Sequence, residues 1–185
     1  MLDEIIDSLD ESEGIPIGNY LSQYCGNFYL SELDHWLKET KRLKYIYRYM
    51  DDVVILHESK EFLHDLRREI DKFSMTNLKL RLKENWQVFS VDTRGIDFVG
   101  YIIFHDRILL RKRTCKNMKR RLIHILEKSQ KGEIMNYSEF CTINSYDGWI
   151  RHCNSTGLRN KYVVPLRQYA NNYYVNVIKK NPRKI

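Results

Sequence analysis

The chain has 185 residues, of which 43% are hydrophobic and 12% aromatic, enough to bury the core of one domain or of one small domain with a subdomain. Only three prolines and eight glycines argue against a disordered or linker-rich protein. The net charge of +7 favours a polyanionic partner such as nucleic acid, and no run approaches the ~18 apolar residues of a membrane span. The acidic, amphipathic start is unlike a signal or transit peptide. We therefore expect a cytoplasmic protein that has no membrane partner.

The cysteines and histidines show no metal-binding or disulfide pattern. Cys25, Cys115, Cys141 and Cys153 lie far apart and form no C-x-x-C pair. We expect buried, reduced thiols rather than disulfides or a zinc site. The six histidines are equally scattered, so we assign them no ligand role.

Helical and strand patterns alternate along the first 110 residues. Residues 2–9 predict a short amphipathic helix, and residues 13–18 form a connector bounded by glycine and proline. Apolar residues then recur with helical spacing over residues 19–41 and again over residues 58–73, on either side of a hairpin at residues 45–57.

Further strands are predicted before the chain becomes helical. Leu78, Leu80 and Leu82 alternate as in a strand, which resumes near residues 87–91. Residues 94–104 and 106–113 predict a strand pair that turns around His105–Asp106. We therefore expect an α+β part over residues 1–110, with two helices packed on one face of an antiparallel sheet.

An all-helical part is expected over residues 111–185. Thr114 is the expected N-cap of its first helix. The tyrosines of its last helix fit a helix-bundle core, although they could also stack on bases. The expected helices cover residues 114–128, 137–153 and 156–178, and these tyrosines are Tyr162, Tyr169, Tyr173 and Tyr174.

Asp51 and Asp52 stand side by side between two strand-forming runs, "YIYRYM" and "VVIL". A solvated turn explains a polar pair by itself, since aspartate tolerates turn geometry. Two like charges raise the cost of ionising each other, however, and a rigid hairpin that holds them together gains most from a divalent cation. Mg²⁺ prefers carboxylate oxygens together with substrate phosphates. The pair therefore predicts a magnesium site, with Mn²⁺ as the alternative ion and a further carboxylate from elsewhere to complete it.

The stretch "YMDD" (Tyr49–Asp52) resembles the Y-x-D-D catalytic turn of reverse transcriptases. Other stretches are similar to further parts of these enzymes, in the same order along the chain. Residues 14–34 resemble the loop and helix under the nascent base pair, residues 78–85 resemble the strand after the turn, and residues 95–101 resemble the primer grip. Residues 107–113 resemble the start of the thumb, and residues 145–155 resemble a thumb helix. The resemblance implies a retroelement RNA-directed DNA polymerase, a nucleotidyltransferase that uses two Mg²⁺ ions, an RNA template, a DNA primer and dNTPs. It also implies a partial polymerase palm over residues 1–110 and a helical thumb bundle over residues 111–185.

The same resemblance assigns a role to individual residues. Asp51 and Asp52 become the catalytic residues and metal ligands. The implied nucleotide or template contacts are Gly18, Ser22, Gln23, Tyr49, Met50 and Lys83, and the implied primer grip contains Phe98, Gly100 and Tyr101.

The second motif of the family narrows the subtype. Most bacterial retroelement enzymes have Q-G-x-x-x-S-P at this point, whereas "IGNYLSQ" (Ile17–Gln23) resembles the version found in diversity-generating retroelements. This resemblance implies a bacterial or phage enzyme that copies a template RNA with errors at adenines. It also implies a small basic accessory protein as a partner.

The helix after the connector carries a row of amides beside a row of small residues. Asn19, Gln23 and Asn27 follow one another at intervals of one turn. The neighbouring row of small residues consists of Gly18, Ser22 and Gly26. Such a face admits either a base pair or a closely packed strand, and spacing alone favours neither. The roles of Asn19 and Asn27 stay open.

Residues 107–121 carry eight basic residues and no acidic residue. A solubilising surface is the alternative, but so many uncompensated positive charges favour contact with nucleic-acid phosphates. The expected backbone contacts are Arg111, Lys112, Arg113, Lys116, Lys119 and Arg120.

Reverse transcriptases carry a fingers region and a first catalytic aspartate well upstream of the loop that begins here at Gly14. We therefore expect a C-terminal portion that needs an N-terminal half as partner and does not polymerise alone. The alternative function is a non-catalytic RNA-binding remnant or accessory module of a retroelement. A third alternative is a basic α+β protein whose Y-x-D-D arose by chance.

Overall fold

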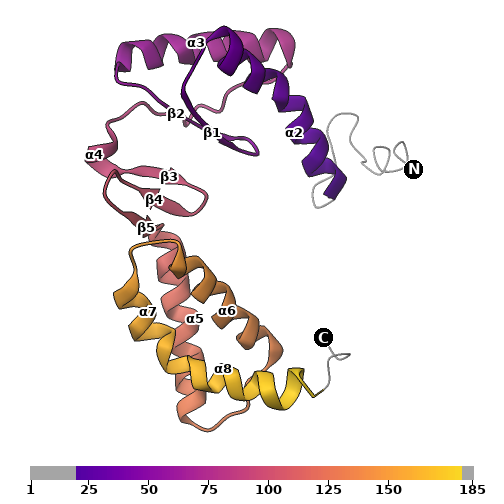
Figure 1. Ribbon diagram of the computed structural model, residues 1–185, viewed down its shortest axis with the longest axis vertical. Helices are drawn as coiled ribbons and strands as arrows, with labels where there is room; N and C mark the ends of the chain where they lie inside the picture. The colour runs from indigo at the N-terminus through magenta and orange to yellow at the C-terminus, as the bar shows by residue number, and fades with distance from the viewer. Residues whose placement is uncertain (1–19, 181–185) are drawn as a thin grey trace. The chain divides into compact units, whose positions relative to one another are not determined.

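The computed structural model describes residues 20–180, which fall into two compact units divided between Phe89 and Ser90. Each unit combines helices with a small antiparallel sheet (Figure 1), so the α+β class is confirmed. The predicted helix at residues 2–9, the connector and Gly18 lie outside the described residues. The division into palm and thumb at residue 110 stays a prediction, because compactness alone does not identify polymerase subdomains.

The first unit confirms the predicted helix, hairpin and second helix. Its elements are α2 (Tyr20–His35), a π-helical turn (Trp36–Thr40), β1 (Tyr45–Tyr49), β2 (Asp52–Leu56) and α3 (Lys60–Asn77). Ser59 caps α3, since its side chain accepts a hydrogen bond from the backbone N–H of Phe62 at 3.1 Å.

The core of this unit lies between the helices and the hairpin. Leu37 and Leu66 come from the two helical segments and are fully buried. Ile46 of β1 and Ile55 of β2 pack against the same cluster. The helices therefore cover one face of the hairpin, as the apolar spacing predicted.

The strand predicted over residues 78–91 is wrong. Leu78 is 2% exposed but Leu80 is 40% exposed, because Lys79 between them has a φ of 54° and interrupts the extended backbone. Further along, Trp86 lies under the guanidinium of Arg67 from α3, 4.6 Å from the ring centroid. Side-chain contacts rather than a strand ladder hold this segment, and a short helix, α4 (Val91–Arg94), follows it.

The second unit opens with a three-stranded antiparallel sheet, β3 (Ile96–Phe98), β4 (Tyr101–Ile103) and β5 (Ile108–Leu110). The strand pair predicted to turn at His105–Asp106 is confirmed by β4 and β5. The β3–β4 hairpin was not predicted, because its two-residue loop is Val99–Gly100 and valine is not a typical turn residue.

The predicted helical part is confirmed, with two corrections. Its elements are α5 (Lys112–Gln130), α6 (Tyr137–Arg151), α7 (Thr156–Tyr162), a 3-10 turn (Val164–Leu166), α8 (Arg167–Tyr173) and a π-helical turn (Tyr174–Ile178). Thr114 is not the N-cap of α5, since Arg111 holds that position without a side-chain cap. The last predicted helix is interrupted around Pro165, which has no backbone N–H to donate.

The helices of the second unit enclose a core of their own. Met118 and Leu122 of α5, Ile150 of α6 and Leu166 are fully buried at its centre. Among the C-terminal tyrosines, Tyr162, Tyr169 and Tyr173 pack against this core and Tyr174 is exposed. The expectation of buried thiols is wrong for Cys141, which is exposed, while Cys25, Cys115 and Cys153 are half-buried. Over residues 20–180, no helix has both the length and the apolar character to span a bilayer.

Candidate active site

The carboxylate pair lies at the tip of the β1–β2 hairpin. Tyr49 pairs with Asp52, so that Met50 and Asp51 form the loop. Met50 has a φ of 54°, a conformation that glycine adopts freely and other residues reach only at a cost. Asp51 and Asp52 are both exposed, as ligands for a solvent-borne ion must be.

Lys83 lies at this carboxylate pair. Its Nζ donates a hydrogen bond to Oδ2 of Asp51 at 2.6 Å, although the two side chains are 72% and 68% exposed. The hydrogen bond from Lys83 and the backbone hydrogen bond of Asp51 lower the pKa of the Asp51 carboxyl. The pKa of Lys83 is raised, chiefly by its hydrogen bond to Asp51 and also by the charge of Asp52. The negative charge of the turn thus binds the ammonium group of Lys83 in this structure.

Arg48 connects the turn to α2 through hydrogen bonds. Its sequence pattern had predicted no role for it. Its guanidinium donates hydrogen bonds to Asp34 and Asn27 of α2 and to the carbonyl of Met50. Strand alternation places Arg48 on the face that carries Ile46, toward α2. A charged residue on a covered strand face needs a partner, and this signal could have identified Arg48 from sequence.

The predicted nucleotide contacts occupy two elements near the turn. Tyr49 is 57% exposed and lies on the same face of β1 as Tyr45 and Tyr47, both also exposed. Ser22 and Gln23 lie on α2, about one turn before Asn27, which contacts Met50. The structure therefore brings Lys83, Met50 and Tyr49 to the carboxylates, and Ser22 and Gln23 to the helix that borders them.

The predicted primer grip is the β3–β4 hairpin of the second unit. Its loop residues Val99 and Gly100 have φ angles of 48° and 86°, as a two-residue turn with left-handed loop residues requires. Tyr101 donates its hydroxyl hydrogen to the carbonyl of Trp149 in α6 at 3.1 Å. A Cβ on Gly100 would lie 2.8 Å from the Trp149 ring, so this glycine permits the close contact. Burial raises the pKa of Tyr101.

The predicted phosphate contacts do not form one uniform set. Arg111 donates to Asp97 at 2.7 Å, and Lys119 lies over the Tyr162 ring. The other residues are exposed and fall within about 100° of arc on α5, on the side away from its buried residues. This exposed basic stripe consists of Lys112, Arg113, Lys116 and Arg120.

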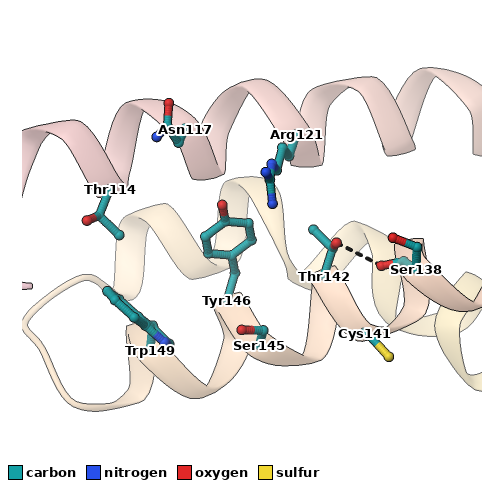
Figure 2. A pocket seen from close by; sticks show the side chains of 9 residues that line it. All are labelled: Thr114, Asn117, Arg121, Ser138, Cys141, Thr142, Ser145, Tyr146 and Trp149. Carbon is teal, nitrogen blue, oxygen red and sulfur yellow. Dashed lines mark hydrogen bonds between the residues drawn. The ribbon is translucent and has the colours of Figure 1, made fainter. Parts of the chain in front are cut away.

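A groove of about 450 Å³ runs between α5 and α6 beside this stripe. Figure 2 shows its walls, with Thr114, Asn117 and Arg121 on α5 and Trp149 on α6, and with the hydroxyl of Tyr146 directed toward α5. Hydroxyls, an amide and one guanidinium line the groove, and no carboxylate does. Such a lining suits a phosphate backbone.

The comparison with protein families agrees with these observations. The family model described as reverse transcriptase (RNA-dependent DNA polymerase) matches residues 5–103, which is more than half of the chain. The match includes the β1–β2 turn, Lys83 and the β3–β4 hairpin. No curated protein matches the chain.

Proposed function

Because the chain belongs to the reverse transcriptase family, we propose that the β1–β2 turn is the catalytic turn of an RNA-directed DNA polymerase. In this proposal Asp51 and Asp52 bind Mg²⁺, with Mn²⁺ as the alternative ion. The observation that carries the proposal is the contact between Lys83 and Asp51, in which the positively charged ammonium group of the lysine binds one carboxylate of the pair.

The side chains at the turn fit a hard divalent ion. Two adjacent, exposed carboxylates offer the oxygen ligands that Mg²⁺ prefers, and substrate phosphates supply further oxygens. Over residues 20–180, no group of three or more His, Cys, Asp or Glu forms a cage for a metal. Asp51 and Asp52 would hold the ion, which would supply activation of the primer 3′-hydroxyl and stabilisation of the leaving pyrophosphate.

The remaining side chains bind and orient the substrates. Lys83 is exposed and tethered only through its ammonium group, so it can exchange Asp51 for the phosphates of an incoming dNTP. Tyr49 and Gln23 offer a ring and an amide to the nascent base pair. The β3–β4 hairpin holds the primer end, and the basic stripe of α5 binds the duplex backbone without reading its sequence.

Primer extension on an RNA template tests the catalytic assignment. The assay uses Mg²⁺ and dNTPs with the chain alone and, in a second arm, with the chain joined to the upstream fingers and palm segment of a family member. We expect no synthesis by the chain alone and synthesis in the second arm, which Asp51→Asn or Asp52→Asn abolishes. Asp65→Asn on the exposed surface of α3 is the matched control and leaves activity unchanged.

Two outcomes contradict this proposal in different ways. If both variants retain the cDNA synthesis of the wild type, the catalytic assignment is wrong. If neither arm produces cDNA and the chain shows only salt-sensitive RNA binding, the non-catalytic alternative replaces it.

We further propose that the enzyme is of the diversity-generating type and acts with a small basic accessory protein, on the basis of "IGNYLSQ". Sequencing of the cDNA from the active arm tests this subtype. Errors concentrated at template adenines support it, and an even error spectrum contradicts it.

A further inference from the structure

Arg48 uses nearly all its hydrogen-bonding capacity around the catalytic turn. Its Nε donates to both carboxylate oxygens of Asp34 at 2.9 and 3.0 Å, and Nη2 donates to one of them at 2.5 Å. Its Nη1 donates to Oδ1 of Asn27 at 2.8 Å and to the carbonyl of Met50 at 3.0 Å. Four of the five N–H groups are therefore engaged, three with α2 and one with the turn.

The surroundings hold this guanidinium in one position. The side chain of Arg48 is 13% exposed, and that of Asp34 is 35% exposed. The hydrogen bonds that Arg48 donates to Asp34 raise the pKa of Arg48 further, so the charge is permanent. A planar guanidinium group that donates hydrogen bonds to two side chains of one helix, here Asp34 and Asn27, has little freedom to rotate.

Met50 is the part of the turn that needs such support. Its φ of 54° lies in the left-handed region, and non-glycine residues persist there only where neighbouring groups fix them. Arg48 holds the carbonyl of Met50, and Nδ2 of Asn27 lies 3.6 Å from its sulfur. The backbone of Asp51 follows directly from that carbonyl.

We propose that Arg48 is a positioning residue that couples α2 to the catalytic turn. Anchored on Asp34 and Asn27, it fixes the peptide between Met50 and Asp51 and thereby the direction from which the Asp51 carboxylate reaches the metal. The inference rests on the proposed function for its catalytic meaning, and on the hydrogen bonds alone for its structural meaning.

The coupling has a consequence for substrate binding. Helix α2 carries Ser22 and Gln23, which are proposed to contact the nascent base pair. A displacement of α2 by a misplaced base pair is transmitted through Asn27 and Asp34 to Arg48, and from there to the turn. Since a shift of about 1 Å at the reacting groups can cost ~100-fold in rate, this network links base-pair geometry to catalysis.

Methionine methyl groups provide the test. The described residues include Met50, Met75, Met118 and Met135, which report on the turn, on α3 and on the core of the second unit. In a chain labelled with ¹³C-methyl methionine, we expect a single sharp Met50 signal for the wild type. Arg48→Lys keeps the charge but cannot bridge all three partners, so the Met50 signal should shift toward its random-coil position while the other signals remain.

Mn²⁺ titration of the same samples adds a readout that a purely structural role would not change. In the wild type, Mn²⁺ bound at Asp51 and Asp52 should broaden the Met50 signal first. In Arg48→Lys the concentration needed should rise about 10-fold or more, as for other residues that orient metal ligands. Asn27→Ala leaves the Asp34 pair intact and should produce a smaller change in the same direction. Arg68→Lys on the exposed face of α3 is the matched control and should change neither readout.

The outcomes separate the inference from the proposed function. If Arg48→Lys leaves both the Met50 signal and the Mn²⁺ concentration unchanged, Arg48 does not position the turn, although the catalytic assignment stands. If Mn²⁺ fails to broaden the Met50 signal selectively in the wild type, the metal assignment is wrong, and the metal-free spectra alone decide the role of Arg48. Loss of the Met75 signal together with Met50 in both variants would show general unfolding of the unit and would overturn a specific role in the turn.

Discussion

Gly100→Ala should destabilise the second unit more than an alanine normally does in a turn. The residue has a φ of 86°, and a methyl group there would lie 2.8 Å from Cζ3 and 3.1 Å from Cη2 of Trp149. The left-handed conformation costs alanine about 1–2 kcal/mol, and overpacking adds about 1–3 kcal/mol. The unfolded chain loses freedom as well, which returns about 0.4–1 kcal/mol. The free energy of unfolding should therefore fall by about 1–5 kcal/mol, which is the range that these contributions span when they are summed.

Gly132→Ala separates the two causes. Gly132 has a φ of 73° with no heavy atom within 4 Å of the added methyl, so only the backbone cost applies. Urea unfolding followed by circular dichroism compares the two variants in the wild-type chain and in a Trp149→Leu background. In that background the ring is absent, and the difference between the two variants should largely disappear.

A cost of Gly100→Ala no larger than that of Gly132→Ala would show that the Trp149 ring does not oppose the added methyl group. An excess cost that persists after Trp149→Leu would show the same, because the ring would then not be its origin. In either case the close approach of the β3–β4 hairpin to α6 would not be a determinant of stability.

Three further predictions concern buried or partly buried groups. Burial alone raises the pKa of Glu139, but hydrogen bonds from Lys128 and a backbone N–H outweigh it and lower the pKa, so Glu139→Gln should cost about 1–3 kcal/mol at pH 7 in urea unfolding. A lowered carboxyl pKa gives stability that is present above the unfolded value of about 4.3 and is lost as pH falls through the folded pKa. The gap should therefore narrow steadily as pH falls below about 4.3, and a gap that does not narrow contradicts the assignment. Asp147→Asn weakens the contact with Arg159, 2.7 Å away, and should lower the Tm measured by circular dichroism; an unchanged Tm would show that the contact contributes nothing. Leu37→Ala empties a fully buried site and should cost about 2–5 kcal/mol, seen as faster amide exchange in the first unit but not in the second.

The secondary structure that follows from side-chain periodicity was predictable. Helices α2 and α3 agree with the apolar spacing of residues 19–41 and 58–73, because Leu33 of α2 and Leu66 of α3 lie in the core of the first unit. The strand predicted from the alternation of Leu78 and Leu80 was wrong, because the pattern of apolar residues does not reveal that the backbone of Lys79 leaves the extended region. Periodicity describes which side chains can share a face, whereas a single positive φ decides whether they do.

From residue chemistry alone, the candidate site was predictable only where that chemistry is local in sequence, whereas Lys83, 32 residues from Asp51, was found through the family resemblance. The like charges of Asp51 and Asp52 are adjacent, so their need for a cation is visible without a structure. The role proposed for Arg48 depends on its hydrogen bonds to Asn27 and Asp34, which lie 21 and 14 residues away, and no spacing rule connects these residues. The contact of Gly100 with Trp149 is equally non-local.

The contact between Lys83 and Asp51 also affects how a polyanion reaches the turn. With the lysine in place, the hairpin tip presents one unbalanced negative charge instead of two. At physiological ionic strength such charges act over about 8 Å, so their repulsion is felt by a duplex only as it docks. If the turn is catalytic as proposed, the paired lysine reduces the electrostatic repulsion of a template–primer before a metal ion binds, which permits nucleic acid to bind first and the metal with dNTP second.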